Sequence, residues 1–161
     1  MAKIKVAING LGRIGRAFLK TGFEREEIEI VAVNDLGDID NLAYLLKYDT
    51  VYGKNKLDIS VRKDGEKKFL RINSKDVVFV QQKEPSLLPW NELDVDVVVE
   101  STGFFESFEK ARGHLDAGAK RVVISAPAKE GGDVTGVTVL MGINEDDLEK
   151  SQLSSNASCT T

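Results

Sequence analysis

Two groups of residues in this sequence have types and spacings that suit chemistry. The first is the run "GLGRIG" near the amino terminus, in which Gly10, Gly12 and Gly15 follow the G-x-G-x-x-G pattern. Glycines at this spacing let a backbone turn closely around the phosphates of a dinucleotide. The second group is "SNASCTT", which contains the single cysteine, Cys159. The first group suggests a phosphate-binding loop, and the second offers a thiol as a candidate nucleophile.

The surroundings of the glycine run favour dinucleotide binding. A β-rich run at residues 4–8 precedes it, and Leu11, Ile14 and Phe18 follow at helical spacing. The first glycine would permit a tight turn, the second a close approach to pyrophosphate, and the third close packing of helix and strand. The N-terminus of the expected helix offers free N–H groups and a positive dipole to an anion. The alternative is that these glycines serve only turns and packing.

An acidic residue stands where the adenosine ribose of such a cofactor would lie. Asn34 and Asp35 close the second expected strand, and Asp35 follows the last glycine by about 20 residues, as this motif requires. A carboxylate there can accept hydrogen bonds from both ribose hydroxyls and repels a 2′-phosphate. The sequence therefore predicts NAD rather than NADP as the cofactor.

Other polar residues are candidates by position. Residues 100–103 ("ESTG") and 125–127 ("SAP") each follow an apolar run. Ligands of open α/β sheets bind beyond the carboxyl ends of strands, so both segments could line a cofactor crevice or could be ordinary turns. His114 is the only histidine. It falls inside a helical pattern away from the strand ends, so we expect it to be structural or exposed rather than catalytic. We expect Trp90 to be a packing residue.

Local features leave the role of Cys159 open. A single cysteine is often a small buried side chain. Its neighbours Ser158, Thr160 and Thr161 are helix-capping types of little value in a core. A helix N-terminus favours the reactive thiolate, which would make Cys159 a nucleophile. Cys159 and His114 are the only residues of their types, so we expect no metal site built from them.

The elements that must position these residues alternate between strands and helices. The expected strands are residues 4–8, 28–33, 57–62, 68–73, 77–82, 95–99, 121–125 and 137–141. The expected helices follow Leu11, begin after Asp38, cover residues 107–117 and begin near Asn144. Short alternating runs around an Asp-Gly turn indicate hairpins in the middle of the chain. We therefore expect an α/β fold: a doubly wound, mostly parallel Rossmann-type sheet with an inserted antiparallel patch at about residues 55–82.

The composition excludes several classes of function. The 161 residues are 42% hydrophobic and 30% charged, with a net charge of −4, which is typical of a soluble globular protein without a basic surface for nucleic acid or anionic membrane. No apolar run approaches the roughly 20 residues of a membrane span. The amino terminus lacks the apolar segment of a secretory signal, and one cysteine fits a reducing compartment. We therefore expect a cytoplasmic protein.

The motifs together resemble the amino-terminal half of the phosphorylating, NAD-dependent glyceraldehyde-3-phosphate dehydrogenases. The similarity covers the whole chain, and its most specific element is "SNASCTT". The other matching stretches are "INGLGRIGR", "VAVND", "LLKYDTVYG", "VVVESTGFF" and "HLDAGAKRVVISAP".

This resemblance implies roles for individual residues. The cofactor-binding residues would be Gly10, Gly12, Arg13, Ile14, Gly15, Asn34, Asp35, Lys83, Ser101, Thr102, Gly103 and Ser125. Among them, Arg13 and Ile14 would contact the pyrophosphate. Lys83 would lie near the adenine, where the family usually has arginine, and it keeps the charge but loses the planar fork. Ser101, Thr102 and Ser125 would line the nicotinamide end.

The resemblance also implies a reaction. Cys159 would add to an aldehyde, hydride would pass to the nicotinamide, and inorganic phosphate would release an acyl phosphate from the resulting thioester. Ser158 and Thr160 would contact the substrate or the phosphate. The small-molecule partners would be glyceraldehyde 3-phosphate and inorganic phosphate, and the complete enzyme would be a homotetramer.

In this family the histidine that activates the thiol lies beyond the cysteine, in a second domain. We therefore expect residues 1–150 to form the NAD-binding domain and residues 151–161 to begin the catalytic domain, and we expect the 161-residue chain by itself to be inactive. Two alternatives are a stand-alone NAD-binding module without catalysis and a related phosphosugar aldehyde dehydrogenase, such as one that acts on erythrose 4-phosphate.

Overall fold

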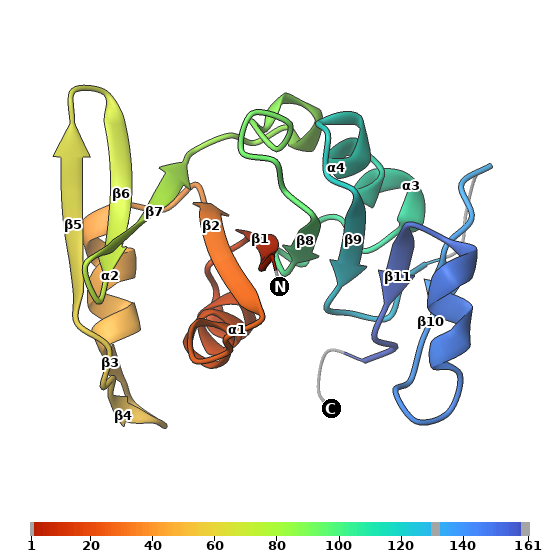
Figure 1. Ribbon diagram of the computed structural model, residues 1–161, viewed down its shortest axis with the longest axis horizontal. Coiled ribbons are helices and arrows are strands. Elements are labelled where there is room, and N and C mark those ends of the chain that lie inside the picture. Colours follow the sequence, from red (N-terminus) through yellow and green to blue (C-terminus); the bar gives the residue numbers. More distant parts are fainter. Residues whose placement is uncertain (1, 130–132, 159–161) are drawn as a thin grey trace.

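A computed structural model describes residues 2–129 and 133–158, and a large twisted sheet runs through this part of the chain (Figure 1). Its strands, in the order in which they lie side by side, are β10 (Val137–Thr138), β11 (Leu153–Ser155), β9 (Arg121–Ile124), β8 (Val97–Glu100), β1 (Ile4–Asn9), β2 (Ile28–Asn34), β7 (Lys75–Val80), β6 (Lys67–Ile72) and β5 (Ile59–Asp64). All neighbours from β10 to β7 are parallel, and β6 and β5 pair antiparallel at one edge. The expected doubly wound, mostly parallel fold is confirmed.

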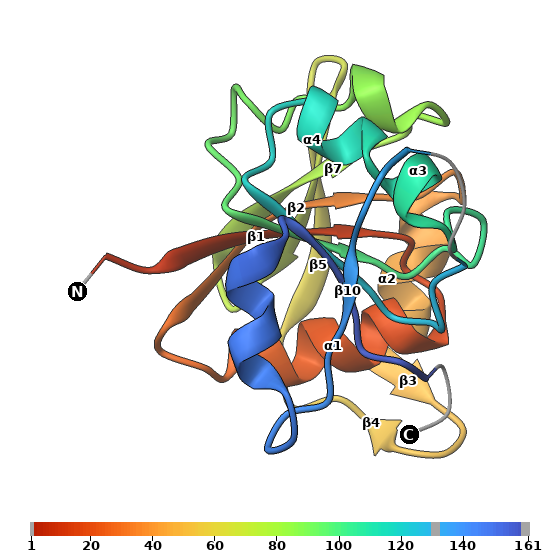
Figure 2. The ribbon, with the colours of Figure 1, turned by 90° about the vertical axis from the view of Figure 1, so that its right-hand side faces the viewer.

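Helices cover both faces of the sheet. The helices are α1 (Arg13–Phe23), α2 (Ile39–Lys47), α3 (Phe108–Ala111) and α4 (Gly113–Asp116), with 3-10 turns η1 (Pro85–Leu87) and η2 (Glu145–Lys150). Figure 2 shows α3 and α4 on one side of the sheet and α1 on the other. Two short strands, β3 (Tyr48–Asp49) and β4 (Gly53–Lys54), form a separate antiparallel ribbon after α2. The result is a three-layer α/β arrangement.

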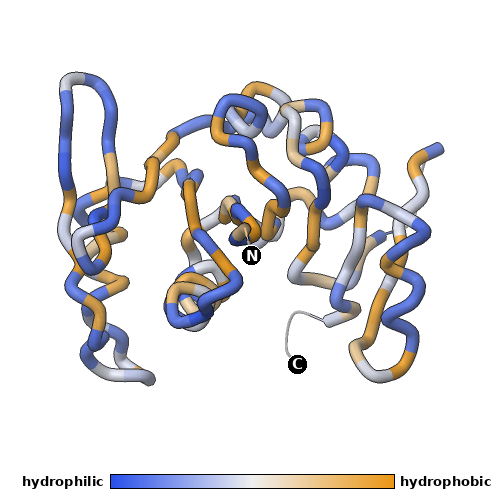
Figure 3. The backbone as a smooth tube through the Cα atoms, in the orientation of Figure 1, coloured by the Kyte–Doolittle hydropathy of each residue, from blue (hydrophilic) through white to orange (hydrophobic). Residues whose placement is uncertain are grey.

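Each face of the sheet has its own hydrophobic core. In β1, Ala7 and Ile8 are both fully buried and point into opposite cores. One core contains side chains of α1 and α2, and the other contains α3, Trp90 and the start of β8. Figure 3 shows hydrophobic residues concentrated along the central strands, whereas the β5–β6 hairpin is largely hydrophilic. Burial on both faces explains why the central strands read as continuous apolar runs.

The antiparallel patch belongs to the main sheet and is not a separate insertion. Its strand β7 pairs in parallel with β2, so β6 and β5 extend the same sheet outward. The Asp64-Gly65 turn forms as expected, with Gly65 at a φ of +59°. The second turn lies earlier than expected, at Asn73 and Ser74, whose φ values of +46° and +68° reverse the chain before β7 begins.

Three elements in the second half differ from expectation. The helix expected over residues 107–117 is interrupted at Arg112 into α3 and α4, although Gly118 ends it with a φ of +102° as expected. Strand β10 is shorter than the expected 137–141. Strand β11 is not expected from the sequence, and it pairs with both β9 and β10. The sheet therefore includes residues beyond position 150, after which we expect the second domain to begin; that boundary stays a prediction.

Charged residues join three strands at the amino-terminal edge of the sheet. Asp96, just before β8, accepts hydrogen bonds from the backbone N–H of Lys5 at 2.8 Å and from the ammonium of Lys120 at 2.7 Å. The neighbouring Asp94 pairs with the same two lysines. The Lys120 ammonium, followed by the Lys5 N–H, holds the pKa of Asp96 below its ordinary value. These contacts tie β1, β8 and β9 together at the edge opposite the candidate site.

We expect Asp96→Ala to lower the free energy of unfolding by about 1–2 kcal/mol at pH 7, because the half-buried Lys5 N–H loses its acceptor. A lowered folded-state pKa means that the carboxylate stabilises the fold above its ordinary pKa of 3.8 and loses this effect as the pH falls below that value. Urea unfolding of both proteins at pH 7 and near pH 3 should show the difference shrink in acid. The matched control is Asp64→Ala, whose side chain is 72% exposed. Equal losses at both pH values would contradict the assignment.

Candidate functional site

A cavity at the carboxyl edge of the sheet lies where the strand order reverses. Strand β1 pairs with β2 on one side and β8 on the other, which makes the end of β1 a topological switch point. The cavity has a volume of about 490 Å³, within the usual range for small-molecule sites. Its lining residues are Asn9, Gly10, Gly12, Asn34, Asp35, Leu36, Gln82, Lys83, Glu84, Ser101, Thr102, Phe104 and Phe105. The cavity therefore brings together seven of the predicted cofactor-binding residues: Gly10, Gly12, Asn34, Asp35, Lys83, Ser101 and Thr102.

The three glycines of the motif have different surroundings. Gly10 has a φ of +94°, and a Cβ built on it would lie 2.8 Å from the backbone nitrogen of Thr102. A Cβ on Gly15 would lie 2.0 Å from the carbonyl oxygen of Gly10. A Cβ on Gly12 would have no atom within 4 Å, because Gly12 borders the cavity. Gly10 and Gly15 are thus required for packing, and the open space at Gly12 fits a ligand.

The N-terminus of α1 is open to that space. Gly12 is its N-cap, and no side chain caps the helix. In contrast, Asp38 caps α2 through the N–H of Asn41, and Ser107 caps α3 through the N–H of Lys110. The first-turn N–H groups of α1 lie at the positive end of the helix dipole. This arrangement fits a pyrophosphate, which would supply the missing acceptors.

Asp35 lies at the end of β2 and anchors the glycine loop. One carboxylate oxygen accepts the N–H of Leu11 at 2.7 Å, and the other accepts the N–H of Gly37 at 2.8 Å. Each oxygen of an ionised carboxylate has a second lone pair, so both can still accept hydrogen bonds from a ribose diol. The position of Asp35 in the cavity wall fits the predicted ribose contact, and its link to Leu11 is a feature that the sequence did not reveal.

A smaller cavity of about 170 Å³ adjoins the first. The two cavities share Ser101, Thr102 and Phe105. The remaining lining residues of the smaller cavity are Ile14, Glu100, Gly103, Glu106, Ile124, Ser125 and Ala126. The hydroxyl of Ser101 donates to the carbonyl of Gly10 at 2.8 Å, and that of Ser125 donates to the carbonyl of Glu100 at 3.1 Å. These hydroxyls therefore hold neighbouring strand ends together at the edge of the site.

The remaining predicted residues lie in different places. Arg13 is exposed at the first position of α1 and is not among the residues that line either cavity. Lys83 is exposed on the wall of the larger cavity, and Ser158 is half-buried. Cys159 and Thr160 lie outside the described residues. Within the described part of the chain, no group of His, Cys, Asp and Glu side chains could hold a metal ion, and no helix is long and apolar enough to cross a membrane.

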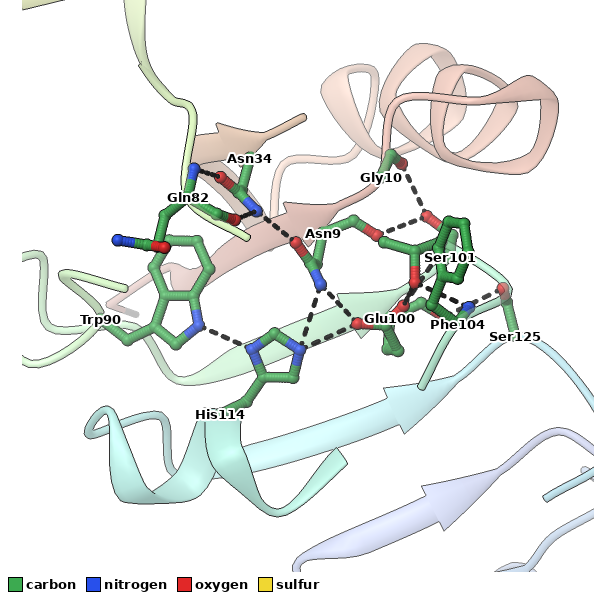
Figure 4. Close-up of polar contacts among 11 residues, drawn as sticks. Asn9, Gly10, Asn34, Gln82, Trp90, Glu100, Ser101, Phe104, His114 and Ser125 are labelled. Carbon is green, nitrogen blue, oxygen red and sulfur yellow. Dashed lines mark hydrogen bonds and ion pairs between the residues drawn. The ribbon is translucent and has the colours of Figure 1, made fainter. Parts of the chain in front are cut away.

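The surroundings of His114 differ in part from those expected from the sequence. It is structural, which agrees with one of the two expectations, but it is fully buried and does not face solvent. It is also not remote from the strand ends, because its Nε2 lies 2.8 Å from Oε2 of Glu100 at the end of β8 (Figure 4). Trp90 is buried as expected, and its indole N–H donates to His114. The helical pattern around His114 does not indicate that its side chain contacts Glu100 and Trp90.

The doubly wound sheet, the glycine loop at its switch point, the uncapped helix and the acidic residue after β2 define a dinucleotide-binding domain of the Rossmann type. Residues 4–108 match the family described as "Glyceraldehyde 3-phosphate dehydrogenase, NAD binding domain", and the chain belongs to this family. The cofactor of the domain is therefore NAD, which confirms the prediction made from Asp35.

Curated relatives are similar over the whole chain. Glyceraldehyde-3-phosphate dehydrogenase 1 of Trichormus variabilis is 49% identical over 100% of this chain. The enzyme of Geobacillus stearothermophilus is 46% identical over 98%, and glyceraldehyde-3-phosphate dehydrogenase 2 of Bacillus subtilis is 44% identical over 99%. The chain spans less than half the length of these relatives, 45–46%. The resemblance seen in the motifs is confirmed.

Proposed function

We propose that this chain is the NAD-binding part of a phosphorylating glyceraldehyde-3-phosphate dehydrogenase, which oxidises an aldehyde to an acyl phosphate. The observation that carries the proposal is the identity of 44–49% to enzymes of this name over 98–100% of the chain. The cavity at the end of β1 supports it, because its walls offer separate surroundings for a pyrophosphate and a ribose. The substrates would be glyceraldehyde 3-phosphate and inorganic phosphate.

Within this proposal the chain's own residues bind and orient the cofactor. The first turn of α1, which includes Arg13 and Ile14, would hold the pyrophosphate against Gly12. The carboxylate of Asp35 would accept hydrogen bonds from the adenosine ribose. When bound, NAD would supply the acceptor for a hydride.

The two ends of the cofactor would meet different walls. Lys83, which borders the larger cavity, would lie on the adenine side. The smaller cavity, with Ser101, Thr102, Gly103 and Ser125, would enclose the nicotinamide end. Asn34 lines the larger cavity and would act through position, because its side-chain amide is paired with the backbone of Gln82 at 2.8 Å through both its nitrogen and its oxygen.

The chemistry at the thiol is proposed from the heptapeptide "SNASCTT". The sulfur of Cys159 would form a bond to the aldehyde carbon, and oxidation of that carbon would leave a thioester. Attack by inorganic phosphate would then break the carbon–sulfur bond, releasing the acyl phosphate and the thiolate. Ser158 and Thr160 would contact the substrate or the phosphate. As the family resemblance implies, a second domain beginning after residue 150 would supply the activating histidine, and the complete protein would be a cytoplasmic homotetramer.

The proposal predicts that the 161-residue chain binds NAD⁺ but does not reduce it. Isothermal titration calorimetry should show one NAD⁺ site, with NADP⁺ as the matched ligand that binds more weakly. NADH absorbance should not rise when glyceraldehyde 3-phosphate and phosphate are added, because the residue that activates the thiol is expected outside this sequence. In a longer protein containing this sequence, Cys159→Ser should abolish turnover and leave NAD⁺ binding intact. Absence of NAD⁺ binding would contradict the site, and turnover by the 161 residues would contradict the need for a second domain.

A further inference from the structure

A connected set of buried polar side chains lies behind the cofactor cavity (Figure 4). We call it the Trp90–Asn34 network; its members are Trp90, His114, Glu100, Asn9 and Asn34, each between 0 and 5% exposed. They come from separate places in the sequence and meet at the carboxyl ends of β1, β2 and β8. Neither Trp90 nor His114 lines either cavity.

The hydrogen bonds of the network have a definite direction. The indole N–H of Trp90 can only donate, and it lies 3.0 Å from Nδ1 of His114. Nδ1 must therefore be the acceptor. An imidazole ring carries at least one N–H, so the proton is on Nε2, which donates to Oε2 of Glu100 at 2.8 Å. The amide nitrogen of Asn9, 3.3 Å from Nε2, is then a neighbour and not a hydrogen-bond partner of the ring.

Glu100 is the centre of the network. Its Oε2 accepts from His114 and from the amide of Asn9, and its Oε1 accepts the backbone N–H and the hydroxyl of Thr102. All four partners are donors, so the surroundings are complementary to an ionised carboxylate. Because each oxygen accepts two of these donors, removing either oxygen as an acceptor would take the acceptor from two donors at once.

Three loops of the cofactor cavity are fixed by this network. Thr102, held by Glu100, belongs to the loop after β8, and a Cβ on Gly10 would already be 2.8 Å from its backbone nitrogen. Asn9, which precedes Gly10, accepts the amide of Asn34 at 2.7 Å. Asn34 in turn pairs with both backbone groups of Gln82, beside Lys83. The glycine loop and the two loops that face it therefore share one set of hydrogen bonds.

Stability alone does not account for such a network. A buried ionic group is commonly neutral or unfavourable compared with apolar side chains of the same volume, because its desolvation offsets its contacts. A buried network whose donors and acceptors are paired in one arrangement instead favours a single geometry. We propose that Glu100, His114 and Trp90 are positioning residues for NAD. They hold Thr102 and Asn9 where the cofactor loops require them, and NAD binding in turn changes the surroundings of the Trp90 indole N–H. This inference rests on the proposed NAD site and deepens it.

The test compares NAD⁺ affinity with stability in matched variants. Glu100→Gln keeps the shape but turns one acceptor into a donor, and should weaken NAD⁺ binding at least about tenfold by calorimetry. The control is Phe108→Leu, which alters the hydrophobic core that contains Trp90 but has no polar side-chain atom that could join the hydrogen bonds of the network. It should lower the melting temperature and leave the dissociation constant within about twofold. Unchanged affinity in Glu100→Gln, or an equal loss in Phe108→Leu, would overturn the proposal.

A second pair keeps the proposal testable if Glu100→Gln does not fold. Glutamine at position 114 can accept from Trp90 and donate to Glu100, so His114→Gln should retain NAD⁺ affinity better than His114→Leu, which can do neither. Equal affinities would contradict the positioning role.

A spectroscopic readout uses the fact that Trp90 is the only tryptophan. In the unmodified chain, NAD⁺ should shift the NMR resonance of its indole N–H, although this group does not border the cavity. A resonance that stays in place while calorimetry reports binding would overturn the coupling. Failure of the unmodified chain to bind NAD⁺ would instead contradict the NAD site itself.

Discussion

Replacing Asp35 by alanine is expected to weaken NAD⁺ binding by about 10- to 100-fold and to remove most of the discrimination against NADP⁺. Hydrogen bonds to a charged group contribute about 1.5–3 kcal/mol, and each 1.4 kcal/mol is a factor of about ten in affinity. The carboxylate also holds the N–H of Leu11, so its loss loosens the loop that meets the pyrophosphate. Without the negative charge, a 2′-phosphate is no longer repelled. The ratio of the two dissociation constants should therefore fall by at least about tenfold.

The measurement is a pair of calorimetric titrations, with NAD⁺ and with NADP⁺, on each variant. Asp35→Asn separates the two effects of the carboxylate. It removes the charge and can still accept one of the two N–H groups, from Leu11 or Gly37. It should relax cofactor preference nearly as much as alanine while losing less affinity for NAD⁺. Asp64→Ala, in the exposed hairpin, is the control and should change neither constant. If the preference for NAD⁺ survives in both variants of Asp35, this residue does not contact the ribose.

The parts of the fold that the sequence predicted are those encoded by local patterns. The first βαβ unit follows from an apolar run, a glycine motif and a helical period that lie next to one another in the chain. The Asp64-Gly65 hairpin follows from its turn residues alone. Such signals need no knowledge of distant contacts, so the amino-acid pattern alone is enough to locate the cofactor loop.

The elements that were missed depend on distant contacts. Strand β11 is only Leu-Ser-Ser, too short and polar to show a pattern, and it forms because β9 and β10 offer backbone partners on both sides. The expected helix over residues 107–117 is interrupted just before Gly113, where the backbone closely approaches η1; a Cβ there would lie 3.1 Å from Cβ of Pro85. Glycine also weakens a helix interior. In both cases the segments in contact lie far from each other in the sequence.

The Trp90–Asn34 network could not be predicted for the same reason, because its members are far apart in the sequence. Asn9 and Glu100 are 91 positions apart, and Asn9 and His114 are 105 apart. Periodicity placed His114 on a helix but could not tell that its side chain contacts Glu100 at the end of β8. A partial signal was present, because "VVVE" ends an apolar strand with an acid, and its local partner Thr102 hydrogen-bonds only one of the two carboxylate oxygens. A buried acid of this kind requires donors from elsewhere, but many side chains of this sequence can donate, so the pattern did not identify His114 and Asn9 as the ones that do.

Gly12→Ala and Gly15→Ala should affect different properties: the first should weaken NAD⁺ binding, and the second should lower the stability of the fold. A Cβ on Gly15 would lie 2.0 Å from the carbonyl oxygen of Gly10, and a backbone atom cannot move aside as a flexible side chain could. Gly15→Ala should therefore destabilise the chain by more than about 3 kcal/mol. A Cβ on Gly12 would have no atom within 4 Å, and the φ of Gly12 is −69°, an ordinary value for any residue. Gly12→Ala should change stability by less than about 1 kcal/mol.

The same methyl group at Gly12 would occupy the space in front of the uncapped first turn of α1. A pyrophosphate could then no longer approach the helix N–H groups, and NAD⁺ affinity should fall at least about tenfold. Urea unfolding and calorimetry on both variants separate the two effects. Normal NAD⁺ binding by Gly12→Ala would mean that the phosphates do not meet the chain at this glycine, whereas normal stability of Gly15→Ala would mean that α1 and the glycine loop are not in close contact. The contrast tests the separate roles that the motif assigns to these glycines, because it predicts close approach of a pyrophosphate at Gly12 and close packing of helix and strand at Gly15.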